Sequence, residues 1–110
     1  MDAGEFVALW KAEKNAYLVQ LQGEESAAAA QLRALNLSAE QQPKLWAALD
    51  TILSDMLYTV LLGLDGAGSL GGVQHTYAIH DEDGTLISDC GDIEAEAWDQ
   101  FHGNGGSVAD

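Results

Sequence analysis

Residues 43–64 read PKLWAALDTILSDMLYTVLLGL and carry the longest apolar pattern in the chain. The apolar side chains follow the three-and-four spacing of a helix that faces a core, at Leu45, Leu49, Ile52, Leu53, Met56, Leu57, Val60 and Leu64. Two start signals overlap before this pattern. Ser38 and Gln41 have the spacing of a capping box, and Pro43 suits a first turn. The helix therefore begins near Gln42, or a short turn precedes it, and it forms the centre of the fold.

Two further helices are predicted before the central one. Residues 3–22 place apolar side chains at helical spacing before Gly23, at Phe6, Leu9, Trp10, Tyr17 and Leu21. The Ala-rich residues 24–35 have acids at their start and Arg33 near their end, which suits the helix dipole, and Asn36 is a plausible stop.

The sequence after the central helix predicts a hairpin and a last helix. Glycines between residues 63 and 72 predict a flexible loop, and the alternation of residues 73–80 predicts one strand that pairs with residues 85–88. A two-residue loop at Asp83 and Gly84 would put Ile79 and Ile87 on opposite faces. A three-residue turn of Glu82, Asp83 and Gly84 sets the two isoleucines directly across from each other, so we expect that turn, with the hairpin covering the central helix.

Residues 92–102 predict the last helix, which presents Ile93, Ala97, Trp98 and Phe101 to the core, and residues 103–110 predict a flexible tail. The fold class expected is therefore α+β, as a single domain of residues 1–102. It consists of three N-terminal helices, one two-stranded antiparallel hairpin and a C-terminal helix.

Positive charge stops at Lys44. Residues 45–110 hold twelve Asp and Glu against no Lys or Arg, so this part carries −12 of the net charge of −14. Such a surface repels nucleic acid and anionic lipid and speeds encounter with basic partners. The same charge would also serve as a solubility coat.

The chain is expected to be cytoplasmic and away from membranes. Residues 1–5 contain two acids and no basic segment of a secretory signal, and the apolar run 60–64 is too short to span a bilayer. The single Cys90 fits a reducing compartment. Asp89 and Asp92 flank this thiol, which disfavours a reactive thiolate.

No motif with catalytic or cofactor chemistry stands out. Residues 66–71 match G-x-G-x-x-G, but a helix precedes them and a strand follows, the reverse of a dinucleotide-binding unit. Residues 79–90 lack the first and last ligands of a calcium loop. The candidate zinc ligands, which are His75, His80, Cys90 and His102 with Asp65 or Asp81, have no standard spacing. We therefore expect no metal, no cofactor and no enzyme activity.

Glu94 is the one acid placed among apolar residues. At 100° per residue it lies between Phe101 and Trp98 on the predicted last helix. It is either a first-turn glutamate that favours the helix N-terminus, or a carboxylate with a perturbed pKa held in a pocket beside His75 or Tyr77.

Three segments resemble a known group of proteins. They are DMLYTVLLGLDG at residues 55–66, YAIHDEDG at 77–84, and the run from Ile93 and Glu94 to Phe101. They look like small acidic bacterial proteins of unassigned function, some of which are similar to immunity proteins of toxin systems. The resemblance implies a protein that binds a partner, and it carries over no catalytic residue.

The sequence thus favours a small acidic protein-binding module, specifically an immunity-type inhibitor of a basic protein partner. The expected partner-binding residues are the acids of the turn and the last helix: Asp81, Glu82, Asp83, Asp92, Glu96 and Asp99. One alternative is a DNA mimic or transcription-associated adaptor. The other is a small enzyme whose site would use Glu94, Asp65 and the histidines.

Overall fold

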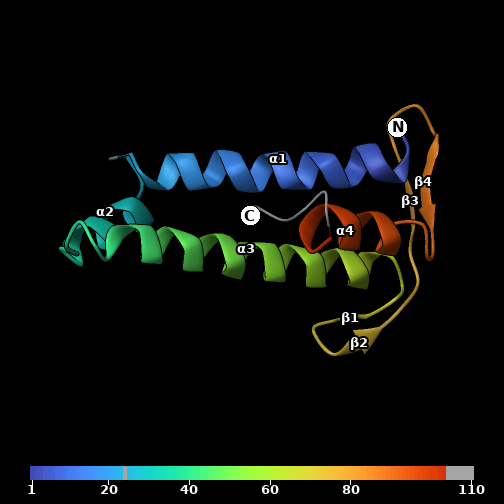
Figure 1. The fold of residues 1–110 in the computed structure, drawn as a ribbon. Coiled ribbons are helices and arrows are strands. Elements are labelled where there is room, and N and C mark those ends of the chain that lie inside the picture. Colours follow the sequence, from blue (N-terminus) through green and yellow to red (C-terminus); the bar gives the residue numbers. More distant parts are fainter. Residues whose placement is uncertain (24, 104–110) are drawn as a thin grey trace.

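The computed structural model describes residues 1–23 and 25–103. These residues form a mixed helix and strand fold with four helices and two short antiparallel hairpins (Figure 1). In chain order the elements are α1 (Ala3–Leu21), α2 (Ala27–Ala34), α3 (Gln42–Leu64), β1 (Ser69–Leu70), β2 (Val73–Gln74), β3 (Ala78–His80), β4 (Leu86–Asp89) and α4 (Glu94–Phe101).

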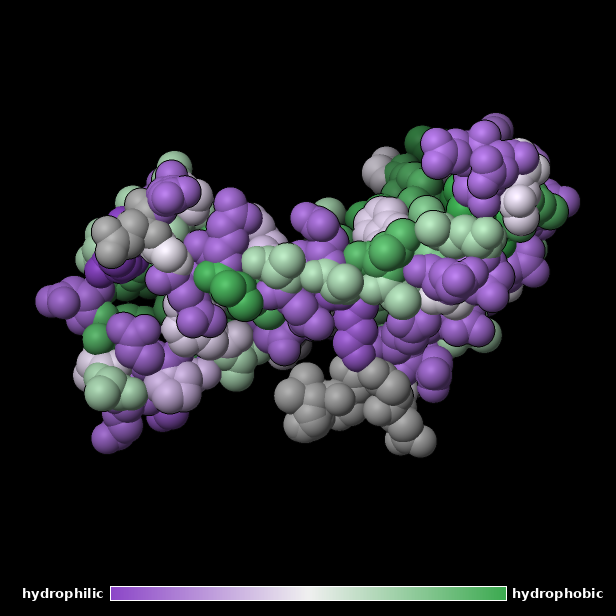
Figure 2. All heavy atoms as spheres, turned by 90° about the horizontal axis from the view of Figure 1, so that it is seen from above, coloured by the Kyte–Doolittle hydropathy of each residue, from purple (hydrophilic) through white to green (hydrophobic). Residues whose placement is uncertain are grey.

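The molecule is built on two long antiparallel helices, α1 and α3 (Figure 1). The short α2 lies at one end of this pair, and α4 and both hairpins lie at the other. The principal extents are 47 × 28 × 28 Å and the radius of gyration is 16.1 Å, against about 13 Å for a compact domain of this length. Figure 2 shows a narrow waist between two broader ends.

The helix boundaries follow from local capping. Asp2 and Glu5 form a capping box at the start of α1, with Asp2 Oδ1 accepting from Glu5 N at 2.8 Å and Glu5 Oε1 accepting from Asp2 N at 2.9 Å. Ser26 caps α2, so that helix starts after the acids expected in its first turn. Its end is near the predicted stop at Asn36, which has a φ of 54°.

Both start signals of the central helix are used, one after the other. Ser38 and Gln41 exchange side-chain hydrogen bonds with each other's backbone N–H, at 2.9 and 3.2 Å. These bonds close a turn, and α3 begins immediately after it, with Pro43 in its first turn. The capping-box residues therefore form the short turn that precedes the helix.

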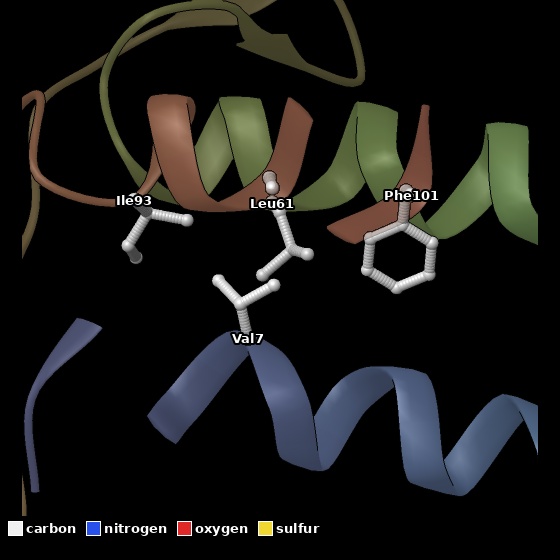
Figure 3. Close-up of a cluster of buried hydrophobic side chains, with 5 residues drawn as sticks. Val7, Leu61, Ile93 and Phe101 are labelled. Carbon is white, nitrogen blue, oxygen red and sulfur yellow. The ribbon is translucent and has the colours of Figure 1, made fainter. Parts of the chain in front are cut away.

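The buried core lies at the end of the molecule that contains α4. In Figure 3, Val7 on α1 points toward Leu61 on α3, with Ile93 and Phe101 on either side. Ala97 completes this cluster. Ile93, Ala97 and Phe101 were expected to face the core and do so, because each is about one helical turn from the next.

A buried ion pair joins α1 and α3 near the middle of the molecule. Lys14 Nζ lies 2.6 Å from Asp50 Oδ1 and donates to Ser54 Oγ at 3.2 Å. The Lys14 side chain is 4% exposed and that of Asp50 is 28% exposed. Lys14 is one of the residues of α1 that face α3, along with Val7 and Leu21, so it fills a position where an apolar residue is usual.

The strands differ from the prediction of a single hairpin. The predicted strand 73–80 is interrupted at residues 75–77, so β2 and β3 belong to different sheets. β2 pairs with β1, which lies inside the segment expected to be a flexible glycine loop. That loop folds because Leu70 packs against Gly63 of α3. The expected tail covers residues 103–110, of which 104–110 lie outside the described residues.

The predicted register of the second hairpin is wrong. Ile79 lies opposite Ser88, and His80 lies opposite Leu86, so a bulge places Ile87 between the two pairs. The bulge turns Ile87 and Ser88 inward, and both are buried. The turn itself is the expected one of Glu82, Asp83 and Gly84, because Asp81 N donates to Thr85 O at 3.0 Å and Gly84 has a φ of 82°. The pair His80 and Leu86 therefore follows the expected alignment, and the strands are shifted by one residue from Ile79 onward, beyond the bulge.

Gly63 offers a test of how β1 is held. A Gly→Ala change inside a helix usually stabilises by about 1 kcal/mol. A Cβ at Gly63 would instead lie 2.5 Å from Leu70 Cγ and 3.1 Å from Ser69 O, which is backbone. We expect Gly63→Ala to lower the free energy of unfolding by about 1–3 kcal/mol, measured by urea denaturation.

Gly4→Ala in α1 is the matched control, since its Cβ would meet only the end of the flexible Glu96 side chain closely, at 3.1 Å. That variant should be neutral or slightly more stable. A stabilising Gly63→Ala would mean that β1 does not pack on α3 in solution.

Candidate functional site

A buried carboxylate joins the end of α3 to the start of α4. Asp65 is fully buried, and its Oδ1 accepts hydrogen bonds from Ser88 Oγ at 2.7 Å and from the backbone N–H of Gly91 and Ile93 at 3.0 Å each. Its Oδ2 accepts from Glu94 N at 2.8 Å. A carboxylate at a helix N-terminus satisfies backbone donors that would otherwise lack partners. The sequence suggested Asp65 only as a possible zinc ligand or enzyme residue, whereas here it holds the backbone.

Glu94 itself lies on the surface. Its backbone N–H contacts Asp65, its side chain is exposed, and it stands in the first turn of α4. This agrees with a first-turn glutamate and not with a carboxylate held in a pocket. The rings of His75 and Tyr77, its expected neighbours, contact each other at a centroid distance of 5.3 Å. The helical projection misled because it counted Trp98 as part of the buried face, whereas Trp98 is exposed and the buried side chains are Ile93, Ala97 and Phe101.

The six predicted partner-binding acids lie at the same end of the molecule, in two groups. Asp81, Glu82 and Asp83 are at the turn after β3, and the other three precede or lie on α4: Asp92, Glu96 and Asp99. Glu82, Asp83, Asp92 and Asp99 are exposed. We call the surface formed by these six residues the acidic end.

Asp81 has a structural task within the acidic end. Its Oδ1 accepts from Asp83 N and Thr85 N, both at 2.9 Å, and its Oδ2 lies 3.1 Å from the amino group of Met1. The hydrogen bond from Thr85 N and the one from the amino group hold the pKa of Asp81 below its ordinary value. Asp81 therefore closes the turn and fixes how the neighbouring acids are presented.

An open groove of about 480 Å³ adjoins the acidic end and shares Asp92 and Glu96 with it. Its lining combines the start of α1, β4 and the approach to α4: Asp2, Ala3, Gly4, Leu86, Ile87, Asp92 and Glu96. Three of these residues carry carboxylates, and Leu86 adds an exposed apolar side chain. Asp2 belongs to the half of the sequence that carries little net charge, so the charge pattern alone did not identify it. The groove can receive a basic side chain with an apolar stem.

Trp98 lies on the side of α4 that faces Tyr58 of α3, about 160° around the helix from Glu96 at 100° per residue. It is 56% exposed, although its helical spacing placed it in the core. Its indole ring contacts the rings of Tyr58 and His102 at centroid distances of 6.0 and 5.4 Å. His102 Nε2 lies 3.7 Å from Asp55 Oδ1. We call Asp55, Tyr58, Trp98 and His102 the Trp98 cluster. Glu94 precedes Trp98 by one helical turn and is exposed, so one carboxylate of α4 lies on the same side of the helix as this exposed aromatic side chain.

The remaining candidate ligands do not form a site. Within residues 1–23 and 25–103, no group of three or more His, Cys, Asp and Glu side chains is arranged to hold a metal ion. Cys90 is exposed, with a φ of 73°.

Comparisons with known proteins found no match: no family model, no curated protein and no solved structure is similar to this chain. By length and composition alone, α3 could cross a membrane, and the apolar run 60–64 is only one part of that helix. The mostly buried core helix of a soluble protein passes the same test, and 11% of the apolar window of α3 is buried.

Proposed function

We propose that the chain is a protein-binding module that takes a basic partner on its acidic end, with Trp98 as an anchor. The observation that carries this proposal is an exposed tryptophan held by two aromatic neighbours, with the exposed Glu94 one helical turn before it. Tryptophan and tyrosine are enriched among the residues that dominate binding energy, and a ring held in place loses little freedom when it binds.

The two parts of this surface have complementary tasks. An Arg or Lys of the partner can lie over the exposed face of Trp98, which attracts a cation. Basic side chains from another part of the partner can enter the acidic groove on the other side of α4. The carboxylates at Glu82, Asp83 and Asp99 lie outside the groove and remain hydrated at the rim. They therefore raise the association rate and contribute little to the lifetime of the complex.

The specific version of this function is an immunity-type inhibitor that neutralises a basic toxin. It rests on the net charge of −14 and on the fast, selective association that matching electrostatic fields allow. The test is co-expression with the candidate partner, in which the wild-type chain should restore growth and a Trp98→Ala chain should not. If the wild-type and Trp98→Ala chains restored growth equally, Trp98 would have no part in this function.

The binding test uses the chain as bait and compares three variants. Glu82, Asp83, Asp92, Glu96 and Asp99 are replaced together by Gln or Asn, and Asp81 is kept because it closes the turn. With the captured partner purified, this variant should associate about tenfold more slowly at low salt and should lose most of its salt dependence. Trp98→Ala should raise the dissociation rate about 30-fold, the equivalent of a 2 kcal/mol anchor.

Glu25→Gln with Glu40→Gln is the matched control, since both residues are exposed and lie toward the α2 end. This control should leave both rates close to those of the wild type. An association rate that changed neither with salt concentration nor with any of these substitutions would mean that the acids serve only solubility.

A further inference from the structure

One side of the α1–α3 pair is apolar and uncovered. Two open grooves follow it, of about 450 and 440 Å³. Leu57 lines the first and Leu53 the second, one helical turn apart, so the grooves are continuous. We call this surface the ribbon face, and it consists of Phe6, Leu9, Trp10 and Tyr17 on α1 with Leu49, Ile52, Leu53, Met56 and Leu57 on α3.

The ribbon face is turned away from α4. Tyr58 and Asp55, which contact the rings of α4 and its C-cap, lie about 145° around α3 from the centre of the apolar stripe at 100° per residue. Ile52 and Met56 are each 60% exposed, and Leu9 is 55% exposed. A helix pair buries one stripe of each helix, and a stable core needs a second layer over the rest. In one copy of the chain, no described element supplies that layer at the waist.

The charge and size of the ribbon face indicate what kind of molecule can bind to it. Glu13 is the one charged residue among those that line the first groove, and no charged residue lines the second. A basic partner would find its complement on the acidic end, and an anionic lipid surface is repelled by a chain of charge −14. A second copy brings a face of identical shape and is equally free of charge along its centre.

The area is sufficient for such a pairing. Helices of 19 and 23 residues are about 28 and 34 Å long, and each is about 10 Å wide, so the pair presents roughly 600 Å² before side-chain relief is counted. Each partner in a standard interface buries about 800 Å² of accessible surface. Two ribbon faces packed against each other would form a four-helix bundle, a common arrangement of antiparallel helix pairs.

We propose that two copies of the chain pack ribbon face against ribbon face as a symmetric dimer. Ile52 and Met56 lie near the middle of the face, and the acidic ends remain outside the interface. Because each copy carries −14, salt screens their repulsion and tightens the dimer, whereas salt weakens binding at the acidic end.

Sedimentation over a range of protein concentrations, at low and high salt, measures the dimer directly. We expect the wild-type dimer to strengthen with salt, and its melting temperature to rise with protein concentration. Ile52→Asp with Met56→Asp should weaken dimerisation by about 100-fold or more, because two carboxylates per chain would be buried without partners. These side chains are exposed in a single copy, so the helical circular dichroism should remain.

Val73→Asp is the matched control, an equally exposed apolar residue on β2 and outside the face, and it should dimerise like the wild type. Leu9→Asp provides a second disrupting variant on α1. A wild-type chain that stays monomeric at about 100 μM in high salt would overturn the proposal, as would a dimer that survives these substitutions. Binding of the wild-type monomer to neutral phosphatidylcholine vesicles, abolished by Ile52→Asp with Met56→Asp, would assign the face to a membrane instead.

Discussion

Replacing Asp65 by Ala should destabilise the protein more than any other single substitution at a polar residue, by about 3–5 kcal/mol. The change leaves the Ser88 hydroxyl and the backbone N–H groups of Ile93 and Glu94 without their acceptor, whereas Gly91 N keeps the backbone oxygen of residue 65. Each buried donor without a partner costs about 1–3 kcal/mol. The expected fall in melting temperature is roughly 15 °C for a domain of this size. Circular dichroism at one fixed protein concentration measures it.

Two control substitutions separate the role of Asp65 from a general effect of lost charge. Ser88→Ala removes one of the donors and should cost about 1–2 kcal/mol. Asp89→Ala removes a neighbouring exposed carboxylate and should change stability by less than about 0.5 kcal/mol. Equal effects of Asp65→Ala and Asp89→Ala would show that the hydrogen bonds to Asp65 do not hold α4 in solution.

The second large effect is expected at the buried ion pair. Asp50→Ala should cost about 2–4 kcal/mol, because it leaves the Lys14 ammonium buried with only Ser54 as a partner. Lys14→Met keeps the length of the side chain and removes the charge, while Asp50 still reaches water, so we expect a change within about 1 kcal/mol of the wild type.

Urea denaturation of both variants and of the double variant Lys14→Met with Asp50→Leu tests this asymmetry. The double variant should recover most of the stability lost in Asp50→Ala, since no charge is then left buried. A greater loss from Lys14→Met than from Asp50→Ala would contradict the expected order.

Local signals predicted the helices well. The spacing of apolar residues placed α1 and α3 to within a residue or two, and the signals at Ser38 and Pro43 were both used. These features depend on residues close in sequence, and capping and periodicity report them directly. The mixed helix and strand character followed from the same patterns, although the β1–β2 hairpin did not.

Long-range contacts decided what the sequence could not predict. The register of β3 and β4 depends on Ser88 turning toward Asp65, which is 23 residues away. Trp98 has core spacing, but α4 is only eight residues long and packs through Ile93, Ala97 and Phe101. A lysine at an apolar position, Lys14, was the one local signal of the buried pair. The six acids of the acidic end were identified from charge alone, and their role in binding stays a prediction.

The hydrogen bonds of Asp65 also bear on how this chain can change over evolutionary time. The chain leaves α3 at Asp65 and returns to the same carboxylate at Ser88 and Gly91, so the excursion between them is closed at its base. Residues 71–77 are exposed, and doubling the length of a flexible loop costs only about 0.6 kcal/mol in closure entropy. The tip at Gly71 and Gly72 is thus a place where insertions can accumulate and new recognition loops can arise while the helices keep their positions.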